Sequence, residues 1–353
     1  MTPKVAIQTV AYWGPDAGAD LDALLASVAV LNYPKEHLKI VVIDNPSPHG
    51  TAAHHLAPWV GRSDFPLVEI VPSPVNDGYS GGHARGWERS MAWGADYVFL
   101  INQDAFLSVT AIQTMVAFME AHPQTAVAQS LVCEAKGEGR INTCGNRMHY
   151  LGYGLRGTDS SDPRPIFYAS GAAMMVRPLM IERSGGLFDP WNFMYHEDVD
   201  LSWRARLAGF DVASVPESIA YHRYEFNRSM RLFLWMERNR IMTHLSNFRI
   251  PTLLLMLPIV AVMELGGLWF ALRSRRLKDK AATYRWFLKK ETWHKIVKRR
   301  RVVHSIRKRS DRDMLALSVD TLASEEVKSS VLDHVVNPVL SLYGRALRFL
   351  VRW

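Results

Sequence analysis

The sequence predicts an α/β protein in which helices cover a central parallel sheet, followed by a helical C-terminal extension. In the first 130 residues, short runs rich in Val and Ile alternate with segments of helical apolar spacing, a pattern typical of such a sheet. The chain has 353 residues, 48% of them hydrophobic and 22% charged, which is enough for a sizeable core and excludes a disordered protein. The composition changes after Phe248, so we expect a catalytic domain over 1–248 and a basic helical region over 249–353.

The individual elements can be placed in chain order. Leu and Val side chains recur at helical spacing between 21 and 31 before Pro34 ends that helix, and a second helix is expected over 80–93. Segment 97–101 contains no charged residue, as a strand buried on both faces requires. Glycine and polar residues dominate 136–164, which predicts loops or short antiparallel strands. The expected strands are 5–13, 38–43, 67–71, 97–101 and 127–132.

The two cysteines, Cys133 and Cys144, are too few for a disulfide framework, and no Cys-x-x-Cys or Cys/His cluster suggests structural zinc. A reduced compartment is therefore expected. No apolar segment of signal-peptide length occurs near Met1, so we do not expect secretion.

The net charge of +8 is unevenly distributed along the chain. Residues 1–248 carry 20 Lys and Arg against 25 Asp and Glu, whereas residues 249–353 carry 22 against 9. The first part thus has a charge of −5 and the second a charge of +13. A basic region of this kind is typical of proteins that meet phosphates, either those of anionic lipids or those of nucleic acid.

Polar side chains follow two of the expected strands, at the edge where ligands bind in a parallel sheet. Asp44 and Asn45 follow one strand, and Asn102, Gln103 and Asp104 follow another. A carboxylate at such a position is a candidate ligand for a substrate or a metal. Asp44 taken alone is equally well explained as a helix cap or a turn residue.

A glycine-rich segment, 76–86, lies between these two strands. It begins with Asn76 and contains Gly78, Gly82 and Arg85 before it continues as the expected helix. Glycine allows the backbone to approach a phosphate or a ring closely, although a lone glycine-rich turn is also explained as a flexible connection. Its position between two strand-end carboxylates favours a role in binding.

The densest group of charged and aromatic residues is 188–204, where Glu197, Asp198 and Asp200 lie within four positions. Carboxylates this close repel one another, and one role for them is a general base whose pKa is set by its neighbours and by partial burial. The structural alternative is that one carboxylate caps the helix expected near Val199 and that Asp200 pairs with Arg204.

Together these motifs resemble glycosyltransferase family 2, which has the GT-A fold, and within it the bacterial rhamnosyltransferase-like branch. The resemblance covers roughly residues 4–245, and the motifs occur in the family's order at 41–47, 76–86, 102–104, and 170–172 with 185–201. It implies a Rossmann-like mixed sheet flanked by helices. It also implies an inverting enzyme that moves a hexosyl or rhamnosyl group from a nucleotide sugar to a hydroxyl of a lipid-linked or cell-envelope glycan.

The resemblance assigns roles to particular residues. It places a divalent cation, Mg²⁺ or Mn²⁺, on Asp104, the last residue of the family's Asp-x-Asp motif, and on His222. It makes Asp198 the general base, with Glu197 as the other candidate of the pair. The sequence departs from the motif at Asn102, where an Asp is expected, which weakens the expected cation affinity. The residues assigned to the donor are Asp44, Asn76, Gly78, Gly82, Arg85, Asn102 and Gln103.

Elementary chemistry accounts for these residue types independently of the resemblance. A nucleoside diphosphate leaves only when its developing charge is neutralised, which a cation on oxygen ligands achieves; otherwise basic side chains such as Arg223 or Arg228 would have to do so. The acceptor hydroxyl must lose its proton as it attacks the opposite face of the sugar, which requires a nearby carboxylate. A retaining glycosidase fits less well, because it needs two carboxylates flanking the bond and no nucleotide pocket.

Two rival classes remain. One is a nucleic-acid-binding protein whose basic tail grips the phosphate backbone, but aromatic residues in the tail lack an RNA-recognition pattern, so no nucleic-acid partner is expected. The other is a catalytically inactive carbohydrate-binding relative, against which the presence of Asp104 and Asp198 argues.

The C-terminal region contains an apolar segment, 250–272, with one charged residue, Glu264. It is long enough to cross a bilayer, but Pro251 and Pro258 are expected to interrupt it, and a single crossing would export the basic residues that follow. A peripheral or re-entrant segment on the cytoplasmic face of the cell membrane, in contact with membrane lipids, is therefore expected.

The chain ends in a second amphipathic segment. Its apolar side chains share one helical face and three arginines share another, as in a helix that lies in a membrane surface. The alternative is a helix packed on the catalytic domain. The two sets are Leu342, Ala346, Phe349, Leu350 and Trp353, and Arg345, Arg348 and Arg352.

Overall fold

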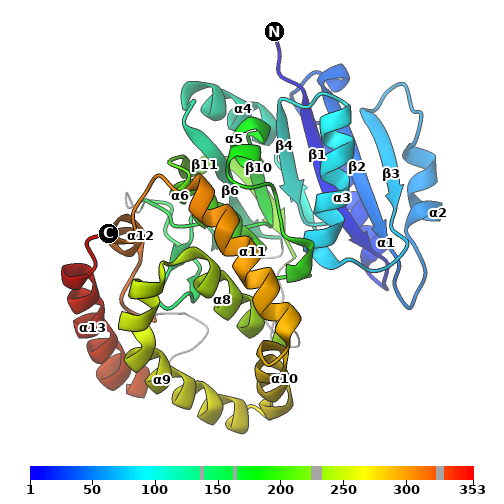
Figure 1. The fold of residues 1–353 in the computed structure, drawn as a ribbon. Coiled ribbons are helices and arrows are strands. Elements are labelled where there is room, and N and C mark those ends of the chain that lie inside the picture. The colour runs from blue at the N-terminus through cyan, green and yellow to red at the C-terminus, as the bar shows by residue number, and fades with distance from the viewer. Residues whose placement is uncertain (136–138, 162–164, 224–232, 323–329) are drawn as a thin grey trace.

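The computed structural model describes residues 1–135, 139–161, 165–223, 233–322 and 330–353. Its central strands are β1 (Val5–Tyr12), β2 (Leu38–Asn45), β3 (Leu67–Pro72), β4 (Tyr97–Ile101), β5 (Ala105–Leu107), β6 (Thr125–Glu134), β7 (Ile141–Thr143), β10 (Ala173–Val176) and β11 (Asp211–His222). They form one mixed sheet in the order β3-β2-β1-β4-β10-β6-β11-β5, with β7 paired to β6 (Figure 1). The four N-terminal strands are mutually parallel, whereas β10 runs antiparallel between β4 and β6.

Helices cover both faces of this sheet. The helices of this part are α1 (Ala17–Ala29), α2 (Ala53–Leu56), α3 (Gly78–Ala92), α4 (Ala111–Ala121), α5 (Pro178–Arg183) and α6 (Glu197–Leu207). In β4, Phe99 packs in the cluster that includes α1 and α4, whereas Val98 and Leu100 pack with α3, α5 and α6. Because successive side chains of a strand point to opposite faces, β4 is buried on both sides, which explains its lack of charge.

The five expected strands and the two expected helices are present. Sequence reasoning missed β10, which has only four residues, and β11, which has twelve. The register of β11 against β6 shifts between Val215 and Ile219, around Pro216 and Glu217. This irregularity interrupts the alternation of apolar and polar residues, so β11 gave no clear strand pattern. Segment 139–161 contains the short antiparallel hairpin of β8 (Arg147–Met148) and β9 (Gly154–Leu155), as predicted.

The C-terminal helices share a hydrophobic cluster with the sheet-bearing part. They are α8 (Phe233–Asn247), α9 (Ile250–Arg273), α10 (Leu277–Phe287), α11 (Lys290–Ile306), α12 (Asp311–Leu317) and α13 (Asn337–Leu350). Tyr150, Phe167 and Trp203 pack in one cluster with apolar side chains of these helices: Met256, Val303, Met314, Leu340 and Leu347. Figure 1 shows α11 lying across α8. The boundary expected after Phe248 thus lies between helices that contribute to one core.

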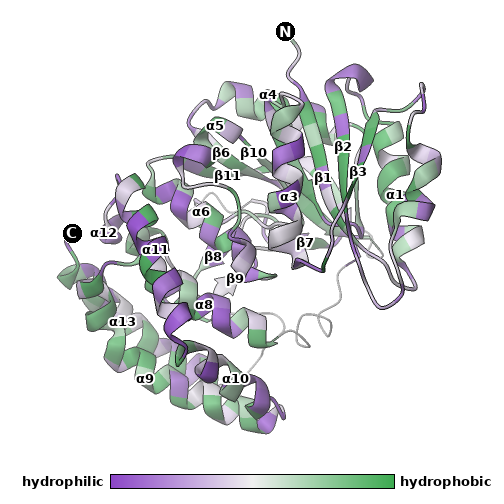
Figure 2. Ribbon diagram, turned by 45° about the vertical axis from the view of Figure 1, so that its right-hand side comes forward, coloured by the Kyte–Doolittle hydropathy of each residue, from purple (hydrophilic) through white to green (hydrophobic). Residues whose placement is uncertain are grey.

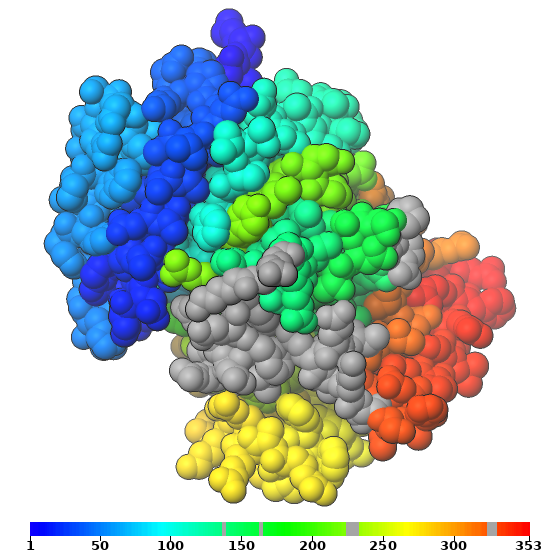
Figure 3. All heavy atoms as spheres, turned by 180° about the vertical axis from the view of Figure 1, so that it is seen from behind, coloured from blue at the N-terminus to red at the C-terminus, as the bar shows by residue number. Residues whose placement is uncertain are grey.

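α9 is one continuous helix, which corrects the expectation that prolines interrupt the apolar segment. Pro251 lies in the first turn, where a missing N–H leaves no intrahelical acceptor unsatisfied, and Pro258 lies within the helix. The Tyr343 hydroxyl of α13 donates to the Leu255 carbonyl oxygen of α9 at 2.6 Å. The two helices therefore lie side by side, with α9 at one end of the molecule (Figure 2, Figure 3).

Candidate functional site

A cavity of about 540 Å³ opens at the carboxyl ends of β1, β2 and β4. Tyr12 and Asn45, which end two of these strands, line it. Eight of the residues expected from the sequence also line it: Asn76, Gly78, Asn102, Gln103, Asp104, Glu197, Asp198 and His222. The strand ends, the glycine-rich segment and the start of α6 therefore meet at one site.

Asp104 and His222 form the part of the cavity suited to a cation. β5 and β11 pair with His222 opposite Ala105, which brings His222 Nε2 to 3.2 Å from Asp104 Oδ1 and 3.2 Å from Asn102 Nδ2. Two ligands at about 2.1 Å from one octahedral Mg²⁺ are about 3 Å apart, so this spacing fits a shared ion. No third His, Cys, Asp or Glu joins them among the described residues. Diphosphate oxygens, water or the Asn102 amide oxygen would complete the ligand set.

Asp44 has a structural role. Its side chain is buried, and its carboxylate accepts the N–H groups of Ala52 at 2.8 Å and Ala53 at 3.0 Å, at the start of α2. Asp44 thus satisfies these N–H groups from the end of β2, a structural role related to the helix cap that the sequence left open, although the N-cap residue itself is Ala52. Asp44 does not line the cavity, whereas its neighbour Asn45 does and donates from Nδ2 to the Gly78 carbonyl oxygen at 3.0 Å.

The glycine-rich segment combines two functions. Gly78 has a φ of 68°, and a Cβ there would lie 2.3 Å from the Phe193 carbonyl oxygen, so only glycine fits this turn. Gly82 packs against β1, where a Cβ would come within 2.7 Å of a valine methyl group, and Arg85 forms an ion pair with Asp77 at 2.6 Å. Neither Gly82 nor Arg85 lines the cavity. The start of the segment shapes the cavity, Gly82 lets α3 pack closely on the sheet, and the Arg85–Asp77 ion pair lies at the N-terminus of α3.

Glu197 and Asp198 begin α6 and lie in different electrostatic environments. Burial, and after it the charge of Asp198, raise the pKa of Glu197 to about 8. Burial also raises the pKa of Asp198, but the N–H groups of Gly171 at 3.2 Å and Val199 at 2.8 Å donate to its carboxylate and oppose this. Near neutral pH burial therefore favours the protonated form of Glu197, whereas the two backbone N–H groups favour the ionised form of Asp198.

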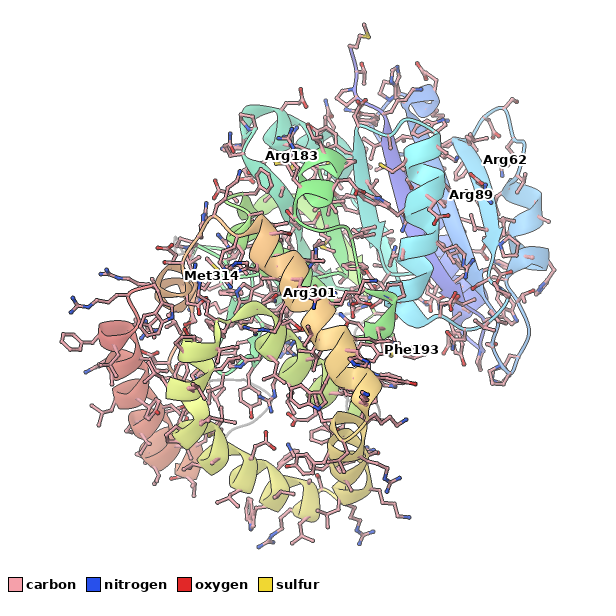
Figure 4. The ribbon with its side chains drawn as sticks, viewed as in Figure 1. Arg62, Arg89, Arg183, Phe193, Arg301 and Met314 are labelled. Carbon is pink, nitrogen blue, oxygen red and sulfur yellow. The ribbon has the colours of Figure 1, made fainter. Side chains whose placement is uncertain are left out.

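The turn before this pair has a strained backbone. Phe193, Tyr195 and His196 have positive φ angles of 62°, 67° and 65°. Such angles are uncommon for residues with a side chain and cluster at functional sites, where the surrounding structure holds them. Ser80 at the start of α3 donates its N–H to the Phe193 carbonyl oxygen at 2.9 Å, and Phe193 lies near that end of α3 (Figure 4). The strain is thus stored next to the carboxylate pair.

Asn239 of α8 fastens this turn. Its Nδ2 lies 2.8 to 2.9 Å from three carbonyl oxygens, those of Asn192, Met194 and Tyr195. Asn239 is fully buried, and its Oδ1 accepts from Arg238 Nε at 2.9 Å. Sequence reasoning missed this residue because it lies 45 positions from Met194 and on a helix rich in charged residues, which predicts exposure.

Asp200 is part of an ion-pair network and not of the cavity. It pairs with Arg204 at 2.8 Å, the structural alternative given above, and also with Arg299 of α11. Burial opposes ionisation of Asp200, but the guanidinium groups of Arg299 and Arg204 outweigh it and lower the pKa of Asp200. Arg299 reaches Asp189 as well, at 2.6 Å. Asp200 therefore joins α6 to the C-terminal region.

Arg223 is a cationic side chain at the cavity. It lines the wall next to His222 and pairs with Asp20 at 2.5 Å. Arg228, the other cation considered as a partner for the leaving group, lies outside the described residues.

Comparison with known proteins adds relatives for the N-terminal part. Residues 17–183 match the family model Glycosyl transferase family 2. The N-acetylglucosaminyl-diphospho-decaprenol L-rhamnosyltransferase of Mycobacterium tuberculosis (strain ATCC 25618 / H37Rv) is 24% identical over 250 residues, covering 63% of this chain and 76% of that protein. The low-salt glycan biosynthesis hexosyltransferase Agl10 of Haloferax volcanii is 23% identical over 247 residues, with the same coverage.

Solved structures share the fold at low sequence identity. GalNAc-T7 with UDP, GalNAc and Mn²⁺ gives a TM-score of 0.55 at 13% identity over 70% of this chain, which spans about half of that one, 49%. S. aureus TarS 1–349 in complex with UDP-GlcNAc gives 0.51 at 13% identity, covering 98% of this chain and 88% of that one. The mannosyltransferase PcManGT from Pyrobaculum calidifontis with GDP-Man and Mn²⁺ gives 0.50 at 13% identity, covering 99% and 84%. Residues 17–183 therefore belong to glycosyltransferase family 2, and the protein has a GT-A-like fold and transfers a sugar from a nucleotide-sugar donor.

Proposed function

We propose that the protein is an inverting glycosyltransferase that moves a hexosyl or rhamnosyl group to a hydroxyl of a lipid-linked or cell-envelope glycan. The observation that carries the proposal is that the Asp198 carboxylate shares one cavity with Asp104 and His222. One relative's name specifies a diphospho-decaprenol-linked acceptor, and another's specifies glycan biosynthesis. Both names support an acceptor of this class.

Asp104 and His222 would hold a divalent cation, Mg²⁺ or Mn²⁺, with Asn102 beside them. When bound, such a cation neutralises the charge that develops on the leaving nucleoside diphosphate. Asn76 and Gly78, which line the cavity, would bind the donor. These residues fix the donor with its diphosphate at the strand ends.

Asp198 would accept the proton of the acceptor hydroxyl. Each of its carboxylate oxygens receives one backbone N–H and keeps a second lone pair for a proton or a hydroxyl group. Glu197 keeps its own proton near neutral pH, which makes it a poor nucleophile. One ionised carboxylate suits direct attack by the acceptor with inversion, whereas retention by double displacement requires a second one.

Thermal stability in the presence of nucleotides tests the donor site. We expect one of UDP, dTDP and GDP to raise the melting temperature of the full chain, and to raise it further with manganese. Transfer of the matching sugar to a lipid-linked acceptor should then be measurable. The proposal fails if none of the three nucleotides stabilises the chain with or without manganese.

We also propose that α9 and α13 hold the enzyme on the cytoplasmic face of the cell membrane. Within the part of the chain that the structure describes, α9 is the one helix that is long and apolar enough to cross a bilayer. Only 11% of its most apolar 18-residue stretch is buried. Glu264 pairs with Arg240 at 3.0 Å and Lys280 at 2.7 Å, so its charge is neutralised within the protein. α9 also exposes apolar side chains along its length: Ile250, Leu254, Leu257, Leu265, Trp269 and Leu272.

This arrangement favours a helix that lies in the membrane surface. α13 packs on the protein through Leu340 and Leu347 and exposes Leu342 and Phe349 on its other side, so it combines the two roles considered for it. Figure 2 shows hydrophobic residues along both helices. Apolar burial of this kind is not screened by salt.

Sedimentation with anionic vesicles tests the membrane proposal. Deleting α9 would remove the buried Met256 and Ile259, so exposed residues are the better targets. We expect the wild type to resist a high-salt wash and the double variant Leu254→Glu, Trp269→Glu to be released. Leu179→Glu, a change at an exposed apolar residue of α5, is the matched control and should leave sedimentation unchanged. A wild-type chain that ignores vesicles would overturn the proposal.

A further inference from the structure

A second cavity, of about 620 Å³, lies between the β8–β9 hairpin and the C-terminal region. Four arginines and two aspartates line it: Arg147, Arg156, Arg345, Arg348, Asp159 and Asp320. The described lining thus has an excess of two positive charges, which favours an anionic ligand.

The hairpin side of this cavity is built to a fixed shape. Gly157 donates its N–H to Asn146 Oδ1 at 3.2 Å, and a Cβ on Gly157 would lie 1.9 Å from the Gly145 carbonyl oxygen. No larger residue fits between these two chain segments. The close contact between Gly145–Asn146 and Gly157 fixes the backbone of Arg147, which follows Asn146, and of Arg156, which precedes Gly157.

Two arginines of α13 line this cavity, and they differ in their bonding within the protein. Each nitrogen of the Arg348 guanidinium group bonds within the protein: it pairs with Asp320 at 2.7 Å and donates to the carbonyl oxygens of Leu315 at 3.0 Å and Ser318 at 2.9 Å. Arg345, one turn earlier, is exposed and forms no hydrogen bond or ion pair with the described residues. Its guanidinium group therefore remains available to a ligand.

The position of this cavity links two surfaces. Arg156 lines both this cavity and the catalytic one. On α13, Leu342 and Phe349 lie three residues before and four residues after Arg345, so they are its neighbours on the helix surface, and they are 71% and 70% exposed. The arginine cavity therefore lies between the catalytic cavity and the exposed apolar face of α13.

We infer that this cavity binds the diphosphate of a lipid-linked acceptor through Arg345, Arg156 and Arg147. The inference rests on the proposed function, in which the acceptor's lipid lies in the membrane at α13 and its sugar reaches Asp198. A guanidinium group matches two phosphate oxygens at once, which makes arginine well suited to this ligand. The phosphate of an ordinary membrane lipid has the same chemistry from another source, and the experiment separates the two.

Binding of farnesyl diphosphate to the full chain, measured by calorimetry in chelator without donor, tests the inference. Chelator removes cations through which the probe could bind at Asp104. We expect Arg345→Glu to weaken binding by about tenfold or more, because it removes charge-assisted hydrogen bonds and adds repulsion, and Arg345→Lys to restore part of it. Arg352→Glu, at another arginine of the C-terminal segment outside the cavity, should bind like the wild type. Unchanged melting temperatures would show that the variants fold.

Three results would overturn the inference. Equal binding in the Arg345→Glu variant would remove Arg345 from the site, and loss of binding in Asp104→Ala would place the probe in the catalytic cavity. Displacement of the probe by phosphatidylglycerol vesicles would assign the site to a lipid headgroup. Because the assay contains neither donor nor cation, these results leave glycosyl transfer untouched, whereas a wild type without transfer activity would refute the function alone.

Discussion

Charged residues have opposite roles in the two parts of the chain. At the carboxyl edge of the sheet, Asp104, Asp198 and His222 face a cavity that can admit a substrate. In the C-terminal region, most arginines of the basic runs 298–301 and 307–309 turn into the protein. The sign and number of charges in a segment therefore do not predict its partners, whereas the position of a charge in the fold does.

The inward arginines have specific partners. Arg300 donates to the carbonyl oxygens of Leu245 and Phe248, and Arg307 pairs with Asp311 at 2.7 Å. With Arg299 and Arg309, four of the seven residues in the two runs bond within the protein. These runs offer phosphates less charge than the sequence suggests, which weakens the nucleic-acid-binding alternative. Membrane attachment then depends more on the apolar faces of α9 and α13.

At the carboxyl edge of the sheet, removal of the cation should have the largest effect on transfer activity. We expect excess chelator to abolish transfer and Asp104→Ala to lower kcat/KM by about 10³-fold, because the leaving diphosphate loses its charge partner. Nucleoside diphosphate binding, measured by calorimetry, should lose its dependence on manganese in the variant. Asp44→Asn, at a carboxylate outside the cavity, is the control and should keep that dependence. Full transfer in chelator would instead assign the neutralising role to Arg223.

In the C-terminal region the largest effect should fall on stability. Arg299→Ala removes a partner of the buried Asp200, and breaking a buried ion pair costs about 3 kcal/mol of unfolding free energy. Arg301, two residues away on the exposed side of α11 (Figure 4), is the matched control, and Arg301→Ala should change stability by less than about 0.5 kcal/mol. Urea denaturation measures both. Equal losses would mean that the runs are not divided into inward and outward charges.

Removal of the general base should have the next largest effect. Asp198→Asn should lower kcat by about 10²-fold or more while donor affinity stays nearly unchanged, because the amide cannot accept the acceptor's proton. Steady-state kinetics and nucleotide calorimetry separate the two quantities. Undiminished turnover would leave Glu197 as the base.

The sequence predicted those parts of the fold that depend on local patterns. Strand β4 was bounded correctly because a charge-free run flanked by polar residues has one explanation in a parallel sheet. β10 was missed because its four residues form a strand only between β4 and β6, neighbours that no local pattern reveals. The continuous α9 was missed because a proline's local preference was overruled by the packing of the helix on α13 and α10.

The candidate site was predicted to a similar degree. Motif positions identified Asp104, Asp198 and His222, which the structure places at one cavity. Sequence alone did not distinguish Asp44 as a cap, since that depends on two amide groups of α2. It gave no indication of Asn239, because the need for that residue arises from a strained turn far away in the chain.

Asn239 links the two parts of the molecule, since it belongs to α8 and acts on the catalytic turn. We expect Asn239→Ala to lower kcat by about tenfold with little change in the donor KM. The reason is that even a small displacement of the carboxylate pair lowers the rate of proton transfer. The pH profile should shift as well, which a purely structural defect would not cause. Thr243→Ala, at a buried polar residue of the same helix, is the matched control and should affect neither. Equal kcat values in the two variants would contradict a positioning role.

The smallest effect concerns the proton on Glu197. With a pKa of about 8, Glu197 ionises as the pH rises from 7 to 9, and a second negative charge beside Asp198 should weaken diphosphate binding and lower kcat/KM a few-fold. Glu197→Gln keeps a neutral side chain and should lose this alkaline decline, whereas Glu88→Gln, at an exposed position of α3, should keep it.

The Glu197 proton also makes the free energy of unfolding depend on pH. Because the pKa of Glu197 is raised in the folded protein, its contribution to stability falls as the pH rises. The folded protein binds the Glu197 proton more tightly than the unfolded chain, whose ordinary value is 4.5, so this contribution is complete below 4.5 and is lost as the pH rises to about 8. Glu197→Gln should therefore melt higher than the wild type at pH 9, and the difference should shrink as the pH falls. A difference that is the same at pH 5 and pH 9 would show that the carboxyl group is not held protonated by burial. The alkaline decline in activity would then belong to another group, and the contrast between a reactive sheet edge and a structural C-terminal region would rest on Asp198 and Asp104 alone.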